Sequence, residues 1–288
     1  MIRIVTDSVA LLPNEVVKQH DISVIPILVI FGDKVYREGV DISYEELFAR
    51  LPEADPPPST SQPSVGEFRA VYQQVLDESP GATILSIHIS SGLSGAVEAA
   101  RQAAIQMPTA DIHVYDSQTL GLEQGFQVIE AARMAKAGVS LAAMIKHLDC
   151  VRENSASFNL VDTMVYLFRG GRVKQVGRLA DQLLGVKPIL TVRNGSISPY
   201  ALPRTRAAGI RLLTNRLESA IQNRERVLIG VMHANVKEVA QELLDSLTER
   251  YQPELGLLSW VGAGLALHTG PGALGLTWST PPALPERE

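Results

Sequence analysis

Two hydroxyl-rich segments of the chain have the composition of anion-binding loops. The first is Ser59-Thr60-Ser61-Gln62-Pro63-Ser64 and the second is Ser90-Ser91-Gly92-Leu93-Ser94. Each precedes a predicted helix, so hydroxyls and unpaired backbone N–H groups gather where the helix dipole favours negative charge. Together the two loops could hold one carboxylate or phosphate. Hydroxyl residues also act as helix caps and turn formers, and this alternative stays open for either loop alone.

Two further positions could contribute a charged or ionisable group. Arg169-Gly170-Gly171-Arg172 places two arginines around a flexible pair, which suits a planar acid group or an acidic protein surface. A solvent-exposed loop without a binding role is the alternative interpretation of this sequence. His268 lies in a tract, residues 255–285, that contains no Asp, Glu, Lys or Arg, so a buried imidazole there needs a polar partner. A histidine satisfied within the core is the alternative.

The chain alternates short apolar runs with amphipathic runs, and this pattern predicts the elements that position the loops. We expect strands at residues 2–6, 23–30, 34–37, 82–89, 112–116, 159–163, 188–192, 227–233 and 273–278. We expect helices from two capping boxes, Ser43 to Glu46 and Ser64 to Glu67, a helix opened by Ser90 to Gly95 that runs to about Met107, and helices at about 121–136, 141–152, 204–222 and 236–251. Asn194-Gly195 predicts a hairpin. Strands that alternate with helices imply a mainly parallel sheet, with ligands at its carboxyl edge.

The chain is long for one hydrophobic core, at 288 residues, and the pattern restarts near residues 153–158. We therefore predict two α/β domains, 1–155 and 156–288. The uncharged tract 255–285 exceeds the ~20 residues that span a bilayer. Its glycines, His268 and Pro271 would interrupt a membrane helix, so we predict a buried strand, turn and strand. We expect a soluble, cytoplasmic protein without a signal peptide or stable membrane insertion.

Several function classes are excluded by what the sequence lacks. No glycine precedes a lysine, so there is no P-loop, and Gly262-Ala263-Gly264 lacks the third glycine of a dinucleotide fingerprint. The histidines are scattered, and the one cysteine, Cys150, excludes an internal disulfide and multi-cysteine metal sites. A net charge of −5 without a Lys/Arg run argues against nucleic-acid binding. We predict no metal and no resident cofactor.

A series of short motifs is spread along the chain from Met1 to about Trp278. They are Val5-Thr6-Asp7-Ser8, Tyr36 to Ile42, Thr60 to Ser64, Ser90 to Gly95, Arg169 to Arg172, Lys187 to Leu190, His233-Ala234 and His268 to Gly275. In this order they resemble the DegV family of bacterial fatty-acid-binding proteins. The resemblance implies a mainly parallel sheet in the N-terminal domain, a smaller α/β C-terminal domain, and a ligand tunnel between them.

By this resemblance the chain is a lipid-binding carrier rather than an enzyme. It would hold a long-chain fatty acid for a separate ATP-dependent kinase subunit, which forms acyl phosphate for phospholipid synthesis. The head group would lie at Thr60 and Ser61 and at the loop of Ser91, Gly92 and Ser94, with His268 nearby; the sequence does not separate Ser91 from Ser94. Arg172 would serve phosphotransfer with the kinase.

A different class of function, a serine hydrolase or acyltransferase that acts on a small acyl substrate, remains as the alternative. It would use Ser91 or Ser94 with His268, and it needs an acidic group to orient the histidine and a preformed oxyanion hole. The tract around His268 contains no acidic residue, so a distant one would have to fold against it.

Overall fold

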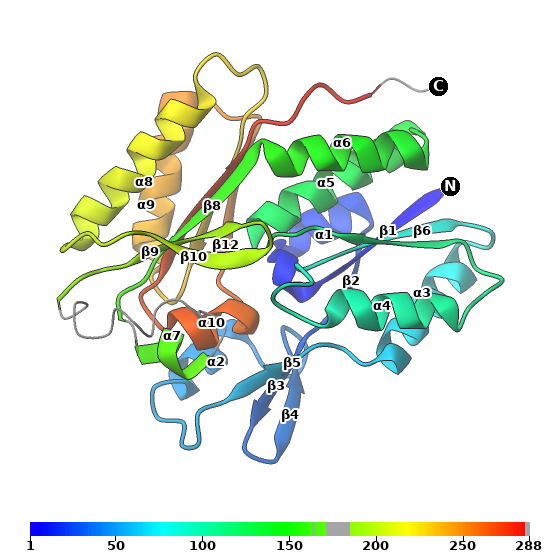
Figure 1. Ribbon diagram of the computed structural model, residues 1–288, viewed down its shortest axis with the longest axis horizontal. Helices are drawn as coiled ribbons and strands as arrows, with labels where there is room; N and C mark the ends of the chain where they lie inside the picture. The colour runs from blue at the N-terminus through cyan, green and yellow to red at the C-terminus, as the bar shows by residue number, and fades with distance from the viewer. Residues whose placement is uncertain (164, 171–184, 286–288) are drawn as a thin grey trace.

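The computed structural model describes residues 1–163, 165–170 and 185–285, which form three β-sheets surrounded by helices (Figure 1). This is the mixed α/β class that the sequence predicts. Among the described residues, every strand of the six-stranded sheet begins at or after Ser155, and the two smaller sheets use only earlier strands. On this basis we propose that the predicted boundary between residues 155 and 156 separates two folding units.

The four-stranded sheet is parallel throughout, as predicted for the N-terminal part. In spatial order its strands are β2 (Ser23–Ile25), β1 (Ile2–Asp7), β6 (Thr83–His88) and β7 (Ile112–Asp116). The helices around it are α1 (Asn14–His20), α3 (Val65–Glu78), α4 (Ala96–Ile105), α5 (Leu122–Ala137) and α6 (Leu141–Glu153). Thr6 lies opposite Ile87 in the register. The loops that follow β1 and β6 therefore start side by side.

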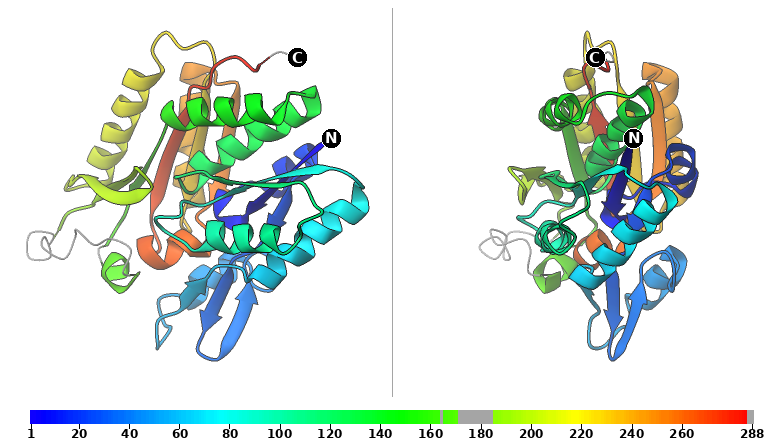
Figure 2. Two further views of the ribbon diagram at one scale, coloured as in Figure 1. Left: turned by 45° about the vertical axis from the view of Figure 1, so that its right-hand side comes forward. Right: turned by 90° about the vertical axis from the view of Figure 1, so that its right-hand side faces the viewer.

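The six-stranded sheet is mixed: of its neighbouring described strands, β11 and β12 pair in parallel and the other pairs are antiparallel. Its spatial order is β10 (Ser196–Ala201), β9 (Ile189–Arg193), β8 (Ser155–Leu160), β13 (Leu274–Ser279), β11 (Leu228–His233) and β12 (Leu255–Trp260). Helices α8 (Arg206–Ile221) and α9 (Lys237–Tyr251) pack against it, and α5 lies between it and the parallel sheet (Figure 2). Because α5 is enclosed by two sheets, even polar residues such as Glu123 and Gln127 are buried.

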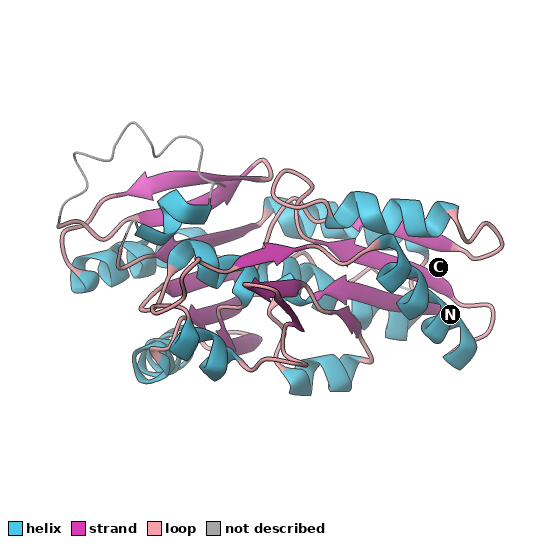
Figure 3. Cartoon of the chain, turned by 90° about the horizontal axis from the view of Figure 1, so that it is seen from below, coloured by secondary structure: helices cyan, strands magenta, loops and turns pink. Residues whose placement is uncertain are grey.

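The third sheet is small and protrudes from the rest of the chain (Figure 2). It contains β4 (Lys34–Arg37), β3 (Leu28–Phe31) and β5 (Ser59–Ser61), and α2 (Tyr44–Arg50) follows β4. Both predicted capping boxes are present, at the starts of α2 and α3. Seen from below, helices lie on both sides of the strands (Figure 3).

The prediction of one strand over residues 23–30 is wrong. The segment divides into β2 and β3, which belong to different sheets, with Pro26 and Ile27 between them. Proline has no N–H to donate to a neighbouring strand, so pairing stops there and the chain changes direction into the small sheet.

Two predictions in the C-terminal half also need correction. The strand predicted at 159–163 begins earlier, as β8 at Ser155, because the Ser157 hydroxyl is satisfied inside the sheet by Thr277 at 2.9 Å. The uncharged tract forms β12, then the helix α10 (Ala263–Thr269), then β13, rather than strand, turn and strand. Six of the seven α10 residues are buried, so its sequence lacks the polar face that would have marked a helix.

Two further short elements border the site described below: the 3₁₀ turn η1 (Ser8–Ala10) after β1 and the helix α7 (Val165–Gly170) after β8. Within the described ranges, no helix is both long and apolar enough to cross a bilayer.

Candidate functional site

A cavity of about 230 Å³ lies where the three sheets approach one another. Its lining comes from η1, the β2–β3 link, β5 and the residue after it, the loops after β6 and β7, β10 and α10. The lining residues are Val9, Ile27, Thr60, Ser61, Gln62, Ile89, Leu93, Ser94, Gly95, Leu120, Ile197, Gly264 and His268. The structure therefore brings together four of the residues that the sequence nominates: Thr60, Ser61, Ser94 and His268.

Thr60 lies at the centre of β5, opposite Val29 of β3, and is half-buried. No hydrogen bond of its hydroxyl is formed with the described residues, so the group can still bind a ligand. The neighbouring Ser61 hydroxyl donates to the Gln62 carbonyl at 3.2 Å. Of these two hydroxyls on the small sheet, only that of Thr60 is uncommitted.

The structure separates the two serines that the sequence leaves equivalent. Ser94 lines the cavity, and its Oγ accepts a hydrogen bond from the Ala96 amide at 3.3 Å, which leaves the hydroxyl proton for a ligand. Ser91 is exposed and does not line the cavity; its hydroxyl donates to Asp116 Oδ2 at 2.5 Å. Of the two, Ser94 has the geometry of a ligand donor.

Gly92 lies outside the cavity lining and has a packing role. A Cβ at this position would lie 2.7 Å from the Gly195 carbonyl oxygen, at the tip of the β9–β10 hairpin. Ser90 fixes the same contact by donating to that carbonyl at 2.9 Å. The glycine therefore lets the serine loop and the hairpin approach closely, and the hairpin in turn supplies Ile197 to the cavity.

His268, in the last turn of α10, is 9% exposed and lines this cavity and a second one of about 40 Å³. Leu120, Ile197 and Gly264 also line both cavities. The surface exposed to the second cavity is almost entirely apolar, and its remaining lining residues are Leu167, Leu190, Val192, Leu265, Asn159, Thr191 and Thr269. A hydroxyl-bearing cavity therefore adjoins an apolar one, with the histidine at the junction.

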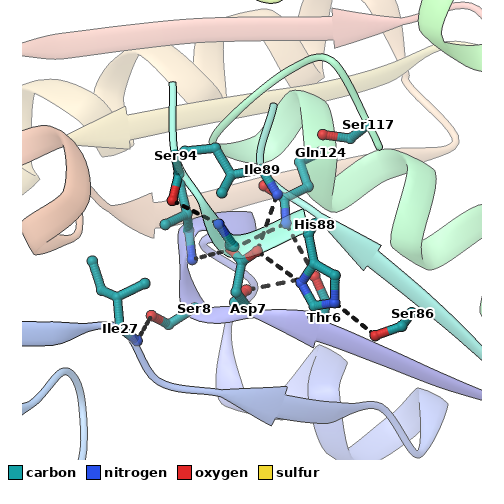
Figure 4. Close-up of polar contacts among 12 residues, drawn as sticks. Thr6, Asp7, Ser8, Ile27, Ser86, His88, Ile89, Ser94, Ser117 and Gln124 are labelled. Carbon is teal, nitrogen blue, oxygen red and sulfur yellow. Dashed lines mark hydrogen bonds and ion pairs between the residues drawn. The ribbon is translucent and has the colours of Figure 1, made fainter. Parts of the chain in front are cut away.

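Beneath the cavity lies a buried polar network that sequence reasoning missed (Figure 4). His88 Nδ1 lies 2.9 Å from Asp7 Oδ2 and His88 Nε2 lies 2.6 Å from Ser86 Oγ, which accepts from the Tyr72 hydroxyl at 2.8 Å. Because a carboxylate only accepts, we assign the imidazole proton to Nδ1. Asp7 also accepts from the Val9 and Ile89 amides at 3.0 Å, and both of these residues line the cavity.

This network has the Ser-His-Asp order of a hydrolase triad, but it is closed to substrate. Tyr72, Ser86, His88 and Asp7 are all 0% exposed. Each group already has its partners, so we interpret the network as a support that holds the ends of β1 and β6. The signal in the sequence was the presence of Ser86 and His88 in the otherwise apolar run of residues 84–89.

Arg172 lies outside the described residues, and so does the side chain of Arg169. Within the described part of the chain, no group of three or more His, Cys, Asp or Glu side chains could hold a metal ion.

Comparison with known proteins agrees with this architecture. A family model described as "Uncharacterised protein, DegV family" matches residues 1–280. The chain belongs to the DegV family. It is 34% identical over 278 residues to Protein DegV of Bacillus subtilis (strain 168), covering 96% of this chain and 98% of that protein. A DegV domain-containing protein of Listeria innocua is 36% identical over 279 residues, covering 96% and 98%.

Solved structures of DegV proteins have the same fold. A Thermus thermophilus DegV family protein, described as binding fatty acid, matches with a TM-score of 0.89 and 30% identity over 97% of this chain and 99% of that one. Bacillus subtilis DegV, described as a fatty acid binding protein, matches with a TM-score of 0.85 and 33% identity over the same shares. A stearic acid-binding protein from Eubacterium ventriosum matches with a TM-score of 0.88 and 28% identity, over 97% and 98%. The predicted family and fold class are confirmed.

Proposed function

We propose that this DegV protein binds one long-chain fatty acid, with its carboxylate at Thr60, Ser94 and His268. The observation that carries the proposal is the junction of two cavities, one with hydroxyls and one largely apolar, that share Leu120, Ile197, Gly264 and His268. A carboxylate needs hydrogen-bond donors, which the first cavity provides. A hydrocarbon tail needs burial among apolar groups, which the adjoining second cavity provides. The relatives described as fatty-acid-binding support the same ligand class.

The apolar cavity is smaller than a long acyl chain requires. At about 40 Å³ it lies well below the ~300 Å³ or more of an ordinary ligand pocket. We therefore expect Leu167, Leu190 and Leu265 to move apart when the tail enters. The aliphatic side chains around it can do so without losing a hydrogen bond.

Extraction of the purified protein with organic solvent, followed by mass spectrometry, tests the proposal. We expect intact fatty acid at close to one molecule per chain, and much less from Thr60→Val, which removes the hydroxyl and keeps the side-chain shape. Failure of the purified protein to bind added stearate in a direct titration would refute the proposal. Turnover of a chromogenic ester, lost in Ser94→Ala, would instead favour the serine hydrolase.

We further propose that the bound acid is a substrate for a separate ATP-dependent kinase subunit, with this chain as a non-enzymatic carrier. The sequence lacks a P-loop, so the nucleotide would come from the partner. The resemblance to the family assigns Arg172 to the transfer. Mixing the stearate-loaded chain with the kinase subunit and ATP should give acyl phosphate, which hydroxylamine traps. Arg172→Ala should keep stearate binding and lose this product; an equal fall in both would refute the assignment.

A further inference from the structure

Glu38 is a buried carboxylate directly after β4, only 4% exposed. Its two oxygens accept hydrogen bonds from different parts of the chain, one from the Ser8 hydroxyl and the other from the Ala263 amide. Its own amide donates to the Ile27 carbonyl at 3.0 Å. Ser8 Oγ also accepts from the Ile27 amide at 3.0 Å (Figure 4). The side chain of Glu38 thus joins η1 to α10, and its backbone amide adds the β2–β3 link.

Each of these contacts lies directly behind the cavity wall. Val9, Ile27 and Gly264 line the cavity. Ile27 is itself bonded to Glu38, and the other two each follow directly in sequence a residue that is bonded to Glu38. A Cβ at Gly264 would lie 3.2 Å from side-chain carbons of both Ile27 and Val9, so the three pieces of wall are in close contact. Glu38 therefore ties them together from behind.

The same contacts connect the two sides of the head-group site. Ala263 begins α10, and the seven-residue helix carries His268 in its last turn. Ile27 leads into β3, whose Val29 pairs with Thr60 of β5. A shift of the first turn of α10 against β3 would change the separation of His268 and Thr60.

We propose that Glu38 is a positioning residue of the head-group site, which holds α10 against the small sheet and so fixes His268 relative to Thr60. The inference rests on the proposed function. A buried carboxylate is costly to keep: burial raises the pKa of Glu38 to about 7, the two hydrogen bonds oppose the rise, and the charge of Asp7 adds to it. An apolar residue would avoid that cost but could not accept from Ser8 and Ala263.

Competition binding of stearate and octadecanol tests the assignment. The two ligands share a tail, and only stearate has a carboxylate. Glu38→Gln keeps the size but replaces one acceptor oxygen with a donor, so we expect stearate to bind about tenfold more weakly while octadecanol changes less than about twofold. The matched control is Glu46→Gln, which alters a carboxylate that caps the exposed start of α2, and it should change neither affinity.

A second variant reaches the same contact from the other side. A Cβ at Gly262 would overlap Glu38 Oε1, so Gly262→Ala must displace the carboxylate and should also weaken stearate selectively. If both variants, shown to be folded by thermal melting, keep the full preference of the wild type for stearate, Glu38 does not position the site. An equal loss for both ligands gives Glu38 a purely structural role and also refutes the inference. A wild type without preference for stearate refutes the proposed function itself.

Discussion

The hydroxyls around the cavity and the polar groups beneath it differ in where their hydrogen bonds go. In the buried network, Asp7 receives hydrogen bonds from two amides, from His88 and from Gln124, and no group is open to solvent. At the cavity, Thr60 has no such bond with a described residue, and Ser94 only accepts one. A polar group saturated by the chain stabilises the fold, whereas one with capacity left over can bind a ligand.

Breaking the saturated network should have the largest effect on stability. His88→Ala removes a hydrogen bond to the buried Asp7 carboxylate and leaves a cavity where the imidazole packed, and the two losses together cost ~3–5 kcal/mol. We expect that decrease in the free energy of unfolding, measured with urea. Ser91→Ala, which alters an exposed hydroxyl, should change stability little. Equal stability of His88→Ala and wild type would show that the network is not a support.

The buried carboxyl group of Glu123 should make stability depend on pH. Burial raises the pKa of Glu123 from 4.5 to about 8, and one of its oxygens has no hydrogen-bond partner within the described chain. The folded state therefore keeps its proton where the unfolded state has lost it. The contribution of the protonated Glu123 to the free energy of unfolding is fully present below pH 4.5. It is lost as the pH rises towards 8, so the free energy of unfolding falls by on the order of 4 kcal/mol over this range.

Glu123→Gln should remove that loss, because the amide does not ionise. Urea unfolding at pH 5 and pH 8 would show it: the variant and the wild type should be close at pH 5, and the variant should be the more stable at pH 8. Glu46→Gln, at an exposed position, is the control and should follow the wild type. A Glu123→Gln protein with the same pH dependence as wild type would contradict this account.

At the open hydroxyls, the effect should fall on binding and leave stability nearly unchanged. Ser94→Ala should weaken stearate by ~1.5–3 kcal/mol, the usual value of a hydrogen bond to a charged group. Ser91→Ala should bind stearate like the wild type, because its hydroxyl is engaged with Asp116. Titration of both variants with stearate distinguishes them. A larger loss in Ser91→Ala would mean that the wrong serine has been assigned.

Much of the fold and part of the candidate site could be predicted because their signals are local. The hydroxyls of Thr60 and Ser94 precede helices, and helix starts are recognisable from sequence. The choice between Ser91 and Ser94 could not be predicted from the sequence. Asp116, which accepts the hydrogen bond from Ser91, lies at the end of β7, whereas Ser91 follows β6. Asp7 and His88 are 81 residues apart, and only the register of β1 and β6 brings them together.

The missed elements have a similar physical reason. β5 is three residues long and consists of Ser59-Thr60-Ser61, which resemble a capping loop more than a strand. It becomes a strand by pairing with β3, and that pairing depends on the change of direction at Pro26. α10 is enclosed on nearly all sides, so its sequence has no helical periodicity of polar residues.

Carbon-13 NMR of stearate labelled at its carboxyl carbon tests the head-group site most directly. In the wild type we expect one resonance from bound stearate. Its change with pH should give the bound carboxyl group a pKa below that of a free carboxylic acid, because hydrogen bonds from Thr60 and Ser94 favour the ionised form. Thr60→Val and Ser94→Ala should each shift the resonance and raise that pKa, and Ser91→Ala should leave both unchanged. A bound carboxyl that titrates like the free acid and ignores Thr60→Val would place the head group elsewhere and contradict the account.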